Sequence, residues 1–260
     1  MTRKRAFDGV RNFRDFGGYT GAGGQKMATG RFFRSANYAL ASDADLDSLA
    51  ALGISAVVDL RRPEERERMP SRRWPDFTAT LIENHDDDEG AGPMSWNGFM
   101  AGWDLSTAAM TAYHLGYYER APTLPRLHDL YGRYFRQLAD SQGPIVVHCA
   151  AGKDRTGIIC ALTHTLAGVH RDDMIADFLL TNDAAVFDAH APLWQAEIEK
   201  QRGRAPSMAT MHVAMGVHES YLERAFQVID QTYGGVDRYL GEVLGIDAET
   251  RAKLEQKLFA

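Results

Sequence analysis

The chain has 260 residues, with 29 Lys plus Arg against 35 Asp plus Glu, and 45% of its residues are hydrophobic. This composition is typical of a globular protein and excludes a disordered, collagen-like or fibrous chain. The formal net charge of −6 argues against a dedicated nucleic-acid binder, because such proteins carry a basic surface. A chain of this length can bury one full core, so we expect a single domain spanning residues 1–260.

The two cysteines, Cys149 and Cys160, are too few for a disulfide framework or for a cysteine-based zinc site. They favour a reducing compartment, and the N-terminus lacks the apolar stretch of a secretory signal. The sequence also contains no segment that is long and apolar enough to span a membrane. We therefore expect a cytoplasmic protein, while export by a route that needs no signal peptide stays open.

The first part of the chain alternates between strand and helix patterns. A short strand is predicted at residues 31–35, and a helix is predicted to begin after Ser42, where Asp45 occupies a capping-box position. Residues 54–60 form an apolar, β-branched run of strand length. Residues 78–82 form a weaker strand.

The middle of the chain continues this alternation. The polar, glycine-bearing stretch at residues 84–104 is predicted to be a long surface loop. Apolar residues at helical spacing predict helices at 106–119 and 123–140, and residues 144–148 form the clearest buried strand. The chain beyond Gly157 is typical of helix, so we expect an α/β fold with an extended helical C-terminal part.

The segment that follows the strand at 144–148 carries the pattern Cys-x5-Arg between Cys149 and Arg155. A loop between a strand and a helix N-terminus points its backbone N–H groups inward, which makes a nest for a tetrahedral oxyanion. The same environment favours the nucleophilic thiolate of Cys149. The planar fork of Arg155 can hold two phosphoryl oxygens at once, and Gly152 lets the backbone bend closely around the ligand.

The signature His148-Cys149-x5-Arg155-Thr156 resembles that of the protein tyrosine phosphatase superfamily. Further blocks are similar to those of bacterial tyrosine phosphatases of the secreted-effector type, and they lie at residues 12–19, 30–35, 59–61 and 177–183. The resemblance covers most of the chain. It implies a dual-specificity-phosphatase-like core, with a central, mostly parallel sheet flanked by helices, and no metal or other cofactor. It also implies phosphotyrosine proteins or peptides as partners, with phosphoserine, phosphothreonine or phosphoinositides as further candidate substrates.

The resemblance assigns roles to the matched positions. Cys149 would be the nucleophile and Arg155 the phosphate clamp, while the Thr156 hydroxyl would stabilise the thiolate leaving group and His148 would support the cysteine. The residues expected to contact the substrate are Ala150, Ala151, Gly152, Lys153 and Arg61. For Lys153 two interpretations stay open, a solvated loop charge or a contact to the additional phosphates of a phosphoinositide.

In-line displacement also requires a carboxylic acid that protonates the departing oxygen and later activates water. Two positions match the family, Asp154 inside the loop and Asp59 at the end of a neighbouring strand. We favour Asp154, because the resemblance implies an acid at this loop position and because its short reach keeps it beside the phosphate. Asp76, in Trp74-Pro75-Asp76, imitates the acid loop of another branch of the superfamily, but an ordinary turn before a strand is the better interpretation.

The other noticeable segments favour structural interpretations. The arginine- and glutamate-rich run at residues 61–73 is typical of a solvated helix with salt bridges, and residues 85–89 are typical of a solvated loop rather than a metal site. Cys160 is expected to pack in the core. Residues 184–216 are apolar at helical spacing, which predicts core helices or, from the resemblance, a helical lid that covers the active site and gates the substrate. We add the hypothesis that such a lid also shields Cys149 from peroxide.

Two other functions use similar residues. A sulfurtransferase or arsenate reductase also has a cysteine in an anion-binding loop, but typical sulfurtransferase loops lack this Cys-to-Arg spacing, and arsenate reduction needs further thiols. A phosphate-binding pseudoenzyme would capture phosphorylated partners without turnover. The presence of Cys149, Arg155 and Asp154 together argues against it.

Overall fold

The computed structural model describes residues 7–86 and 95–259. Within these residues, five strands form one sheet in the order β1-β2-β5-β3-β4. Strands β2, β5, β3 and β4 run parallel, while β1 pairs antiparallel with β2 at one edge. The strands are Arg14–Asp15 (β1), Phe32–Ser35 (β2), Ala56–Asp59 (β3), Thr80–Ile82 (β4) and Ile145–His148 (β5). The α/β class and the four predicted strands are confirmed; the two-residue β1 is too short to leave a sequence pattern.

The register of the sheet fixes where the chemistry can occur. His148, the last residue of β5, lies opposite Ser35 of β2 and Asp59 of β3. All three strands are buried along their whole length, as expected for parallel strands covered on both faces. The Cys149–Arg155 segment therefore leaves the centre of the sheet at its carboxyl edge, where open α/β sheets bind their ligands.

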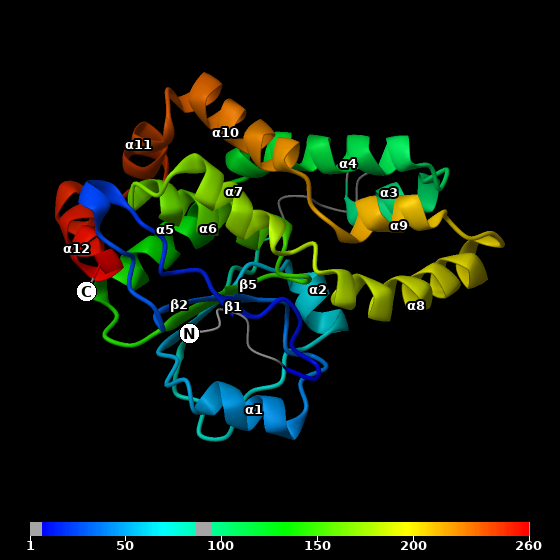
Figure 1. Cartoon of the computed structure of the whole chain (residues 1–260), viewed down its shortest axis with the longest axis horizontal. Coiled ribbons are helices and arrows are strands. Elements are labelled where there is room, and N and C mark those ends of the chain that lie inside the picture. The colour runs from blue at the N-terminus through cyan, green and yellow to red at the C-terminus, as the bar shows by residue number, and fades with distance from the viewer. Residues whose placement is uncertain (1–6, 87–94, 260) are drawn as a thin grey trace.

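Side-chain alternation divides the strands between two apolar cores. On one face, Phe33, Val57 and Val146 pack with Leu46 and Leu49 of helix α1 (Asp43–Ala50), which lies below the sheet in Figure 1. This helix begins with the predicted capping box between Ser42 and Asp45. The opposite face is covered by α5 (Pro125–Asp140) and α6 (Asp154–Leu166), which lie above the sheet.

The remaining helices build outward from this core. The helix predicted at 106–119 is α4 (Thr107–Arg120), and the chain beyond Gly157 is mainly helical, as expected. The other elements are α2 (Pro63–Arg68), α7 (Arg171–Leu179), α10 (Glu219–Tyr233), α11 (Val236–Arg238) and α12 (Ala248–Phe259), with short helical turns at Ala22–Gly24, Ala121–Thr123 and Tyr239–Val243. Within the described ranges, no helix is long and apolar enough to cross a membrane.

A separate apolar cluster lies beside the carboxyl edge of the sheet. It joins α4 to α3 (Trp96–Gly102), α8 (Ala184–Arg202) and α9 (Met208–Met215) through buried residues that include Trp103, Met110, Ile198 and Met211. The expectation that residues 84–104 form a surface loop is therefore wrong for its second half, because Trp96 and Phe99 pack against this cluster. Residues 87–94 of that stretch lie outside the described residues. The predicted helical character of 184–216 is confirmed.

Candidate active site

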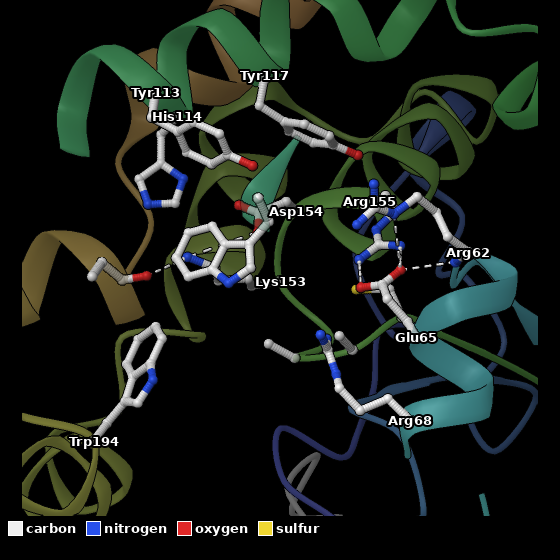
Figure 2. A pocket seen from close by; sticks show the side chains of 15 residues that line it. Arg62, Glu65, Arg68, Tyr113, His114, Tyr117, Lys153, Asp154, Arg155 and Trp194 are labelled. Carbon is white, nitrogen blue, oxygen red and sulfur yellow. Dashed lines mark hydrogen bonds and ion pairs between the residues drawn. The ribbon is translucent and has the colours of Figure 1, made fainter. Parts of the chain in front are cut away.

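A cavity of about 240 Å³ opens at the carboxyl edge of the sheet (Figure 2). Its wall combines the loop after β5 with α2, α4 and three helices, α3, α8 and α9, which we call the outer helices. The lining residues are Arg62, Glu65, Arg68, Trp96, Tyr113, His114, Tyr117, Cys149, Ala150, Ala151, Lys153, Asp154, Arg155, Trp194 and Ala214. The predicted nucleophile, clamp and favoured acid therefore share one cavity, although they were identified only from their order in the chain.

Gly152 gives the loop its tight path. Its φ angle of +67° lies in the left-handed region, which favours glycine. A Cβ atom at this position would lie 2.3 Å from the carbonyl oxygen of Ser35, the last residue of β2. The loop therefore packs directly on the neighbouring strand, and only glycine allows that approach.

Side chains from the N-terminal part of the chain hold the loop carbonyls. Asn12 donates from Nδ2 to the Gly152 oxygen at 2.8 Å, and Arg34 donates from Nη2 to the same oxygen at 2.9 Å. Asn37 donates from Nδ2 to the Ala150 oxygen at 2.8 Å. These bonds hold the carbonyl groups on the outer side of the loop, an arrangement in which the backbone N–H groups can turn toward an anion in the cavity.

A buried ion pair network supports these contacts. Asp177 of α7 accepts from Arg34 Nη1 at 3.0 Å and from Arg14 Nε at 3.3 Å, and all three side chains are buried. Burial alone would raise the pKa of Asp177, but the two guanidinium groups outweigh it and lower the pKa below its usual range. Arg14 also donates to the side chain of Asn12. The separate sequence blocks near residues 12, 34 and 177 therefore meet behind the loop.

Glu65 of α2 fixes the orientation of Arg155. Its carboxylate accepts from Arg155 Nη1 at 2.5 Å and from Nη2 at 2.8 Å, while Nη1 also donates to the Leu60 oxygen at 3.1 Å. These contacts use three of the five guanidinium N–H groups. Among the described residues, the Nε–H and the second N–H of Nη2 keep no such partner, and they lie together on one edge of the guanidinium. That edge is a ready fork for two phosphoryl oxygens.

The Glu65 contact was missed in the sequence, where the run at 61–73, apart from Arg61, suggested solvated charges. Burial would raise the pKa of Glu65, but Arg155 outweighs it and lowers the pKa to about 2, so the carboxylate is ionised at neutral pH. The same carboxylate accepts from the Arg62 backbone N–H at 2.8 Å at the start of α2. The one available signal was this N3 position after Pro63, where a glutamate caps a helix.

Asp154 lies in the first turn of α6 and lines the cavity with Cys149. Tyr118 of α4 donates from Oη to Asp154 Oδ1 at 3.0 Å, and Lys153 Nζ lies 3.7 Å from Oδ2. Tyr118 is fully buried, and this burial raises the pKa of its phenol well above its usual value. The phenol therefore stays protonated and can act only as a donor to the carboxylate at neutral pH.

Asp59, the other candidate acid, is placed elsewhere. Its carboxylate is fully buried behind the loop, and Arg61 binds it through Nε at 2.9 Å and Nη2 at 2.7 Å. Burial would raise the pKa of Asp59, but His148 and Arg61 outweigh it and hold the pKa well below its usual range. Asp59 does not line the cavity.

The expectation that Arg61 contacts the substrate is corrected by the same geometry. Besides Asp59, its guanidinium donates to the Met69 oxygen at 2.6 Å and to Ser71 Oγ at 2.9 Å, so the side chain is 1% exposed. Arg62, the N-cap residue of α2, and Arg68, the last residue of that helix, line the cavity instead (Figure 2). A strand end followed by a helix start turns consecutive side chains in different directions, which the sequence pattern does not resolve.

His148 and Thr156 flank the cysteine from behind. His148 Nδ1 lies 3.3 Å from the Cys149 oxygen, and Nε2 lies 3.7 Å from Asp59 Oδ2. Burial lowers the pKa of His148 to about 4, so the ring is neutral at pH 7. Thr156 is fully buried in α6, and its hydroxyl makes no hydrogen bond within the described part of the chain.

Lys153 is not a solvated loop charge, because it is only 8% exposed. Its Nζ donates to the Ala214 oxygen at 2.8 Å and to the Gly216 oxygen at 3.2 Å, at the C-terminal end of α9 (Figure 2). The carbonyl groups at a helix C-terminus are a favourable site for a cation. Lys153 therefore ties the catalytic loop to the outer helices while it also lines the cavity.

Aromatic side chains complete the cavity wall. Tyr113, His114 and Tyr117 project from α4, and Trp194 of α8 stands on the opposite side (Figure 2). Burial, followed by the charge of Lys153, lowers the pKa of His114 to about 3, so this ring is neutral as well. The outer helices thus cover the site as the lid hypothesis requires, and their gating and shielding of Cys149 stay predictions.

The remaining sequence candidates lie outside the cavity. Asp76 occupies a turn with φ of +55°, next to Trp74 and Phe77 in the α1-side core. Cys160 is buried in α6, and burial raises the pKa of its thiol to about 12. No group of three or more His, Cys, Asp or Glu side chains in the described residues could hold a metal ion. Most of residues 85–89 lies outside the described ranges.

Comparison with known proteins places this site in a family. The sequence profile of the tyrosine phosphatase family matches residues 5–260. A Cupriavidus necator protein named as a tyrosine-protein phosphatase is 35% identical over 246 residues, which cover 93% of this chain and 84% of that protein. Triple specificity protein phosphatase PtpB of Mycobacterium tuberculosis is 30% identical over 276 residues, which cover 95% of each chain. The chain therefore belongs to the tyrosine phosphatase family, whose members are cysteine-dependent phosphatases.

Proposed function

We propose that this phosphatase hydrolyses phosphotyrosine in proteins or peptides through a phosphocysteine intermediate. Cys149 is the nucleophile, Arg155 the phosphate clamp and Asp154 the general acid. The observation that carries the proposal is that these three side chains line one cavity, with one edge of the Arg155 fork left for a ligand.

The substrate phosphate would sit in the loop, where backbone N–H groups from Ala150 to Arg155 and the start of α6 stabilise its negative charge. The Nε and Nη2 edge of Arg155 would hold two equatorial oxygens. Glu65 keeps that edge in place before the substrate arrives, so little reorganisation is needed in the transition state.

In the first step the Cys149 thiolate attacks phosphorus from the side opposite the tyrosine oxygen. The S–P bond forms as the P–O bond to the phenol breaks, and Asp154 gives its proton to the departing oxygen. In the second step water attacks phosphorus while the Asp154 carboxylate takes a proton from it. The S–P bond then breaks, which releases inorganic phosphate and restores the thiolate.

The choice of Asp154 over Asp59 rests on access. Asp154 lines the cavity and its side chain is 20% exposed, whereas Asp59 is fully buried and bound by Arg61. A general acid has to reach the leaving oxygen within hydrogen-bond distance. We assign Asp59 a positioning role, in which it holds Arg61 and His148 behind the loop.

The wall of the cavity favours an aromatic substrate. Tyr113, Tyr117 and Trp194 can flank a phenyl ring on its way to the loop. Lys153 donates to two carbonyl oxygens at the end of α9, so only one N–H of its ammonium group is left for an extra inositol phosphate unless those bonds break. Phosphotyrosine is therefore the leading substrate, and phosphoserine, phosphothreonine and phosphoinositides are secondary candidates.

The test compares wild type with Cys149→Ser on a phosphotyrosine peptide, a phosphoserine peptide and a phosphoinositide panel, all without added metal. Cysteine-dependent release from the phosphotyrosine peptide, with a transient phosphorylated enzyme after acid quenching, is the expected result. Asp154→Ala should slow aryl phosphates with poor leaving groups far more than activated ones. No release from any substrate would refute the proposal, and binding without turnover would indicate a pseudoenzyme.

A further inference from the structure

A second cavity of about 480 Å³ adjoins the catalytic one. The two cavities share Ala150, Ala151 and Lys153 of the catalytic loop, together with Trp194 and Ala214 of the outer helices. A peptide whose phosphotyrosine enters the catalytic cavity would therefore have neighbouring residues within reach of the second one. Successive residues of an extended chain are only about 3.3 Å apart.

Arg11 lines the second cavity and not the catalytic one. Arg11 is half-buried, and this burial lowers its pKa. The buried arginines nearby each bind a carboxylate, as Arg14 and Arg34 do with Asp177. Within residues 7–86 and 95–259, the Arg11 guanidinium makes no hydrogen bond or ion pair. A half-buried guanidinium without a carboxylate is poorly satisfied, and it fits an anion supplied by a ligand.

The rest of the wall agrees with an acidic side chain as that ligand. Burial, followed by the positive charge of Arg11, lowers the pKa of His190 of α8, so these two side chains lie close together in the wall. Met69 and Leu193 supply apolar surface for the methylene groups of a glutamate. Glu197 also lines the cavity, but its carboxylate accepts from Gln201 on the exposed face of α8 and, among the described residues, forms no ion pair with Arg11.

We propose that this second cavity is a specificity subsite for an acidic side chain next to the phosphotyrosine, recognised by Arg11. The inference rests on the proposed function, because it needs a phosphotyrosine peptide in the catalytic cavity. The shared chemistry of its ligand is an anionic side chain, either a carboxylate or a second phosphate monoester.

The experiment uses phosphotyrosine peptides that differ only by Glu or Gln at one position, scanned over three residues on either side. Each peptide pair gives a ratio of kcat/KM values within one enzyme preparation, so a general loss of activity cancels. In the wild type we expect Glu to be preferred roughly fivefold to tenfold at one position, as a charge-assisted contact to arginine gives. Arg11→Gln should reduce that ratio to about one.

The matched control is Arg171→Gln, which removes the same charge from an exposed side chain on α7. Its ratio should remain that of the wild type, since a long-range charge effect would lower both variants alike. Replacing Glu by phosphoserine at the preferred position distinguishes the two anions, because the better substrate of the pair identifies which one the subsite takes.

A wild-type ratio of about one at every position would overturn the subsite, and that comparison needs no variant. Retention of the preference in Arg11→Gln would overturn the assignment to Arg11. Both results require turnover of the peptides, so they differ from a failure of the proposed function, in which no phosphotyrosine peptide is hydrolysed.

Discussion

The ion pair between Glu65 and Arg155 gives a sharp quantitative prediction. Glu65→Gln keeps the shape of the side chain and its cap on Arg62, but it removes the negative charge that faces Arg155. The pKa of Glu65 falls from 4.5 to about 2 in the folded protein. That difference corresponds to about 3 kcal/mol of stability at neutral pH. The breaking of a buried ion pair by removal of one partner costs a similar amount, roughly 3–5 kcal/mol.

The sign of the pH dependence follows from the lowered pKa. A carboxyl group whose folded pKa is depressed stabilises the fold above its unfolded pKa, and this stabilisation is lost as pH falls toward the folded pKa. The difference in unfolding free energy between wild type and Glu65→Gln should therefore be about 3 kcal/mol above pH 5.5. It should shrink by roughly 1.4 kcal/mol for each pH unit below 4.5.

Urea unfolding between pH 7 and pH 3.5 measures this difference. Glu67→Gln on the exposed side of α2 is the matched control, and it should change stability by less than about 0.5 kcal/mol. A double-mutant cycle with Arg155→Met then tests the partner. If Glu65→Gln costs as much without Arg155 as with it, the stabilisation belongs to the helix cap and our reasoning is refuted.

Three further predictions follow from the site. Gly152→Ala should lower the unfolding free energy by at least about 2 kcal/mol, while the control Gly30→Ala, with φ of +75° but open space around the added Cβ, should lower it by only about 1 kcal/mol. Equal losses in thermal unfolding would contradict the clash with Ser35. Tyr118→Phe removes the donor to Asp154, so it should slow the hydrolysis of aryl phosphates with poor leaving groups about fivefold or more. A uniform effect over a series of leaving groups would show that Tyr118 does not position the acid. Asp59→Asn should lower the unfolding free energy in urea by roughly 3 kcal/mol, because it leaves Arg61 buried without its carboxylate, but the dependence of the hydrolysis rate on the leaving group should stay that of the wild type. A steeper dependence would identify Asp59 as the acid.

The sequence by itself determined the features whose signals are local. The Cys149–Arg155 pattern indicated an anion-binding loop, because a buried strand, a glycine and a helix start stand in immediate succession. The apolar run before it predicted the central strand. Ser42 and Asp45 predicted a helix start that the structure confirms. In each case the residues that decide the structure are separated by only a few positions.

The tertiary structure decided which side chains face the loop. Glu65 and Glu67 belong to the same short charged helix, yet one is buried against Arg155 and the other is exposed. Arg61 and Arg62 are neighbours, yet only Arg62 lines the catalytic cavity.

The same reason explains the aromatic wall of α4 and the contact of Lys153 with α9. A polar or aromatic side chain is directed by the elements that pack around it, and those elements are distant in the chain. The local pattern therefore determined where the chemistry lies, and only the packing of α2, α4, α8 and α9 decided which residues support it.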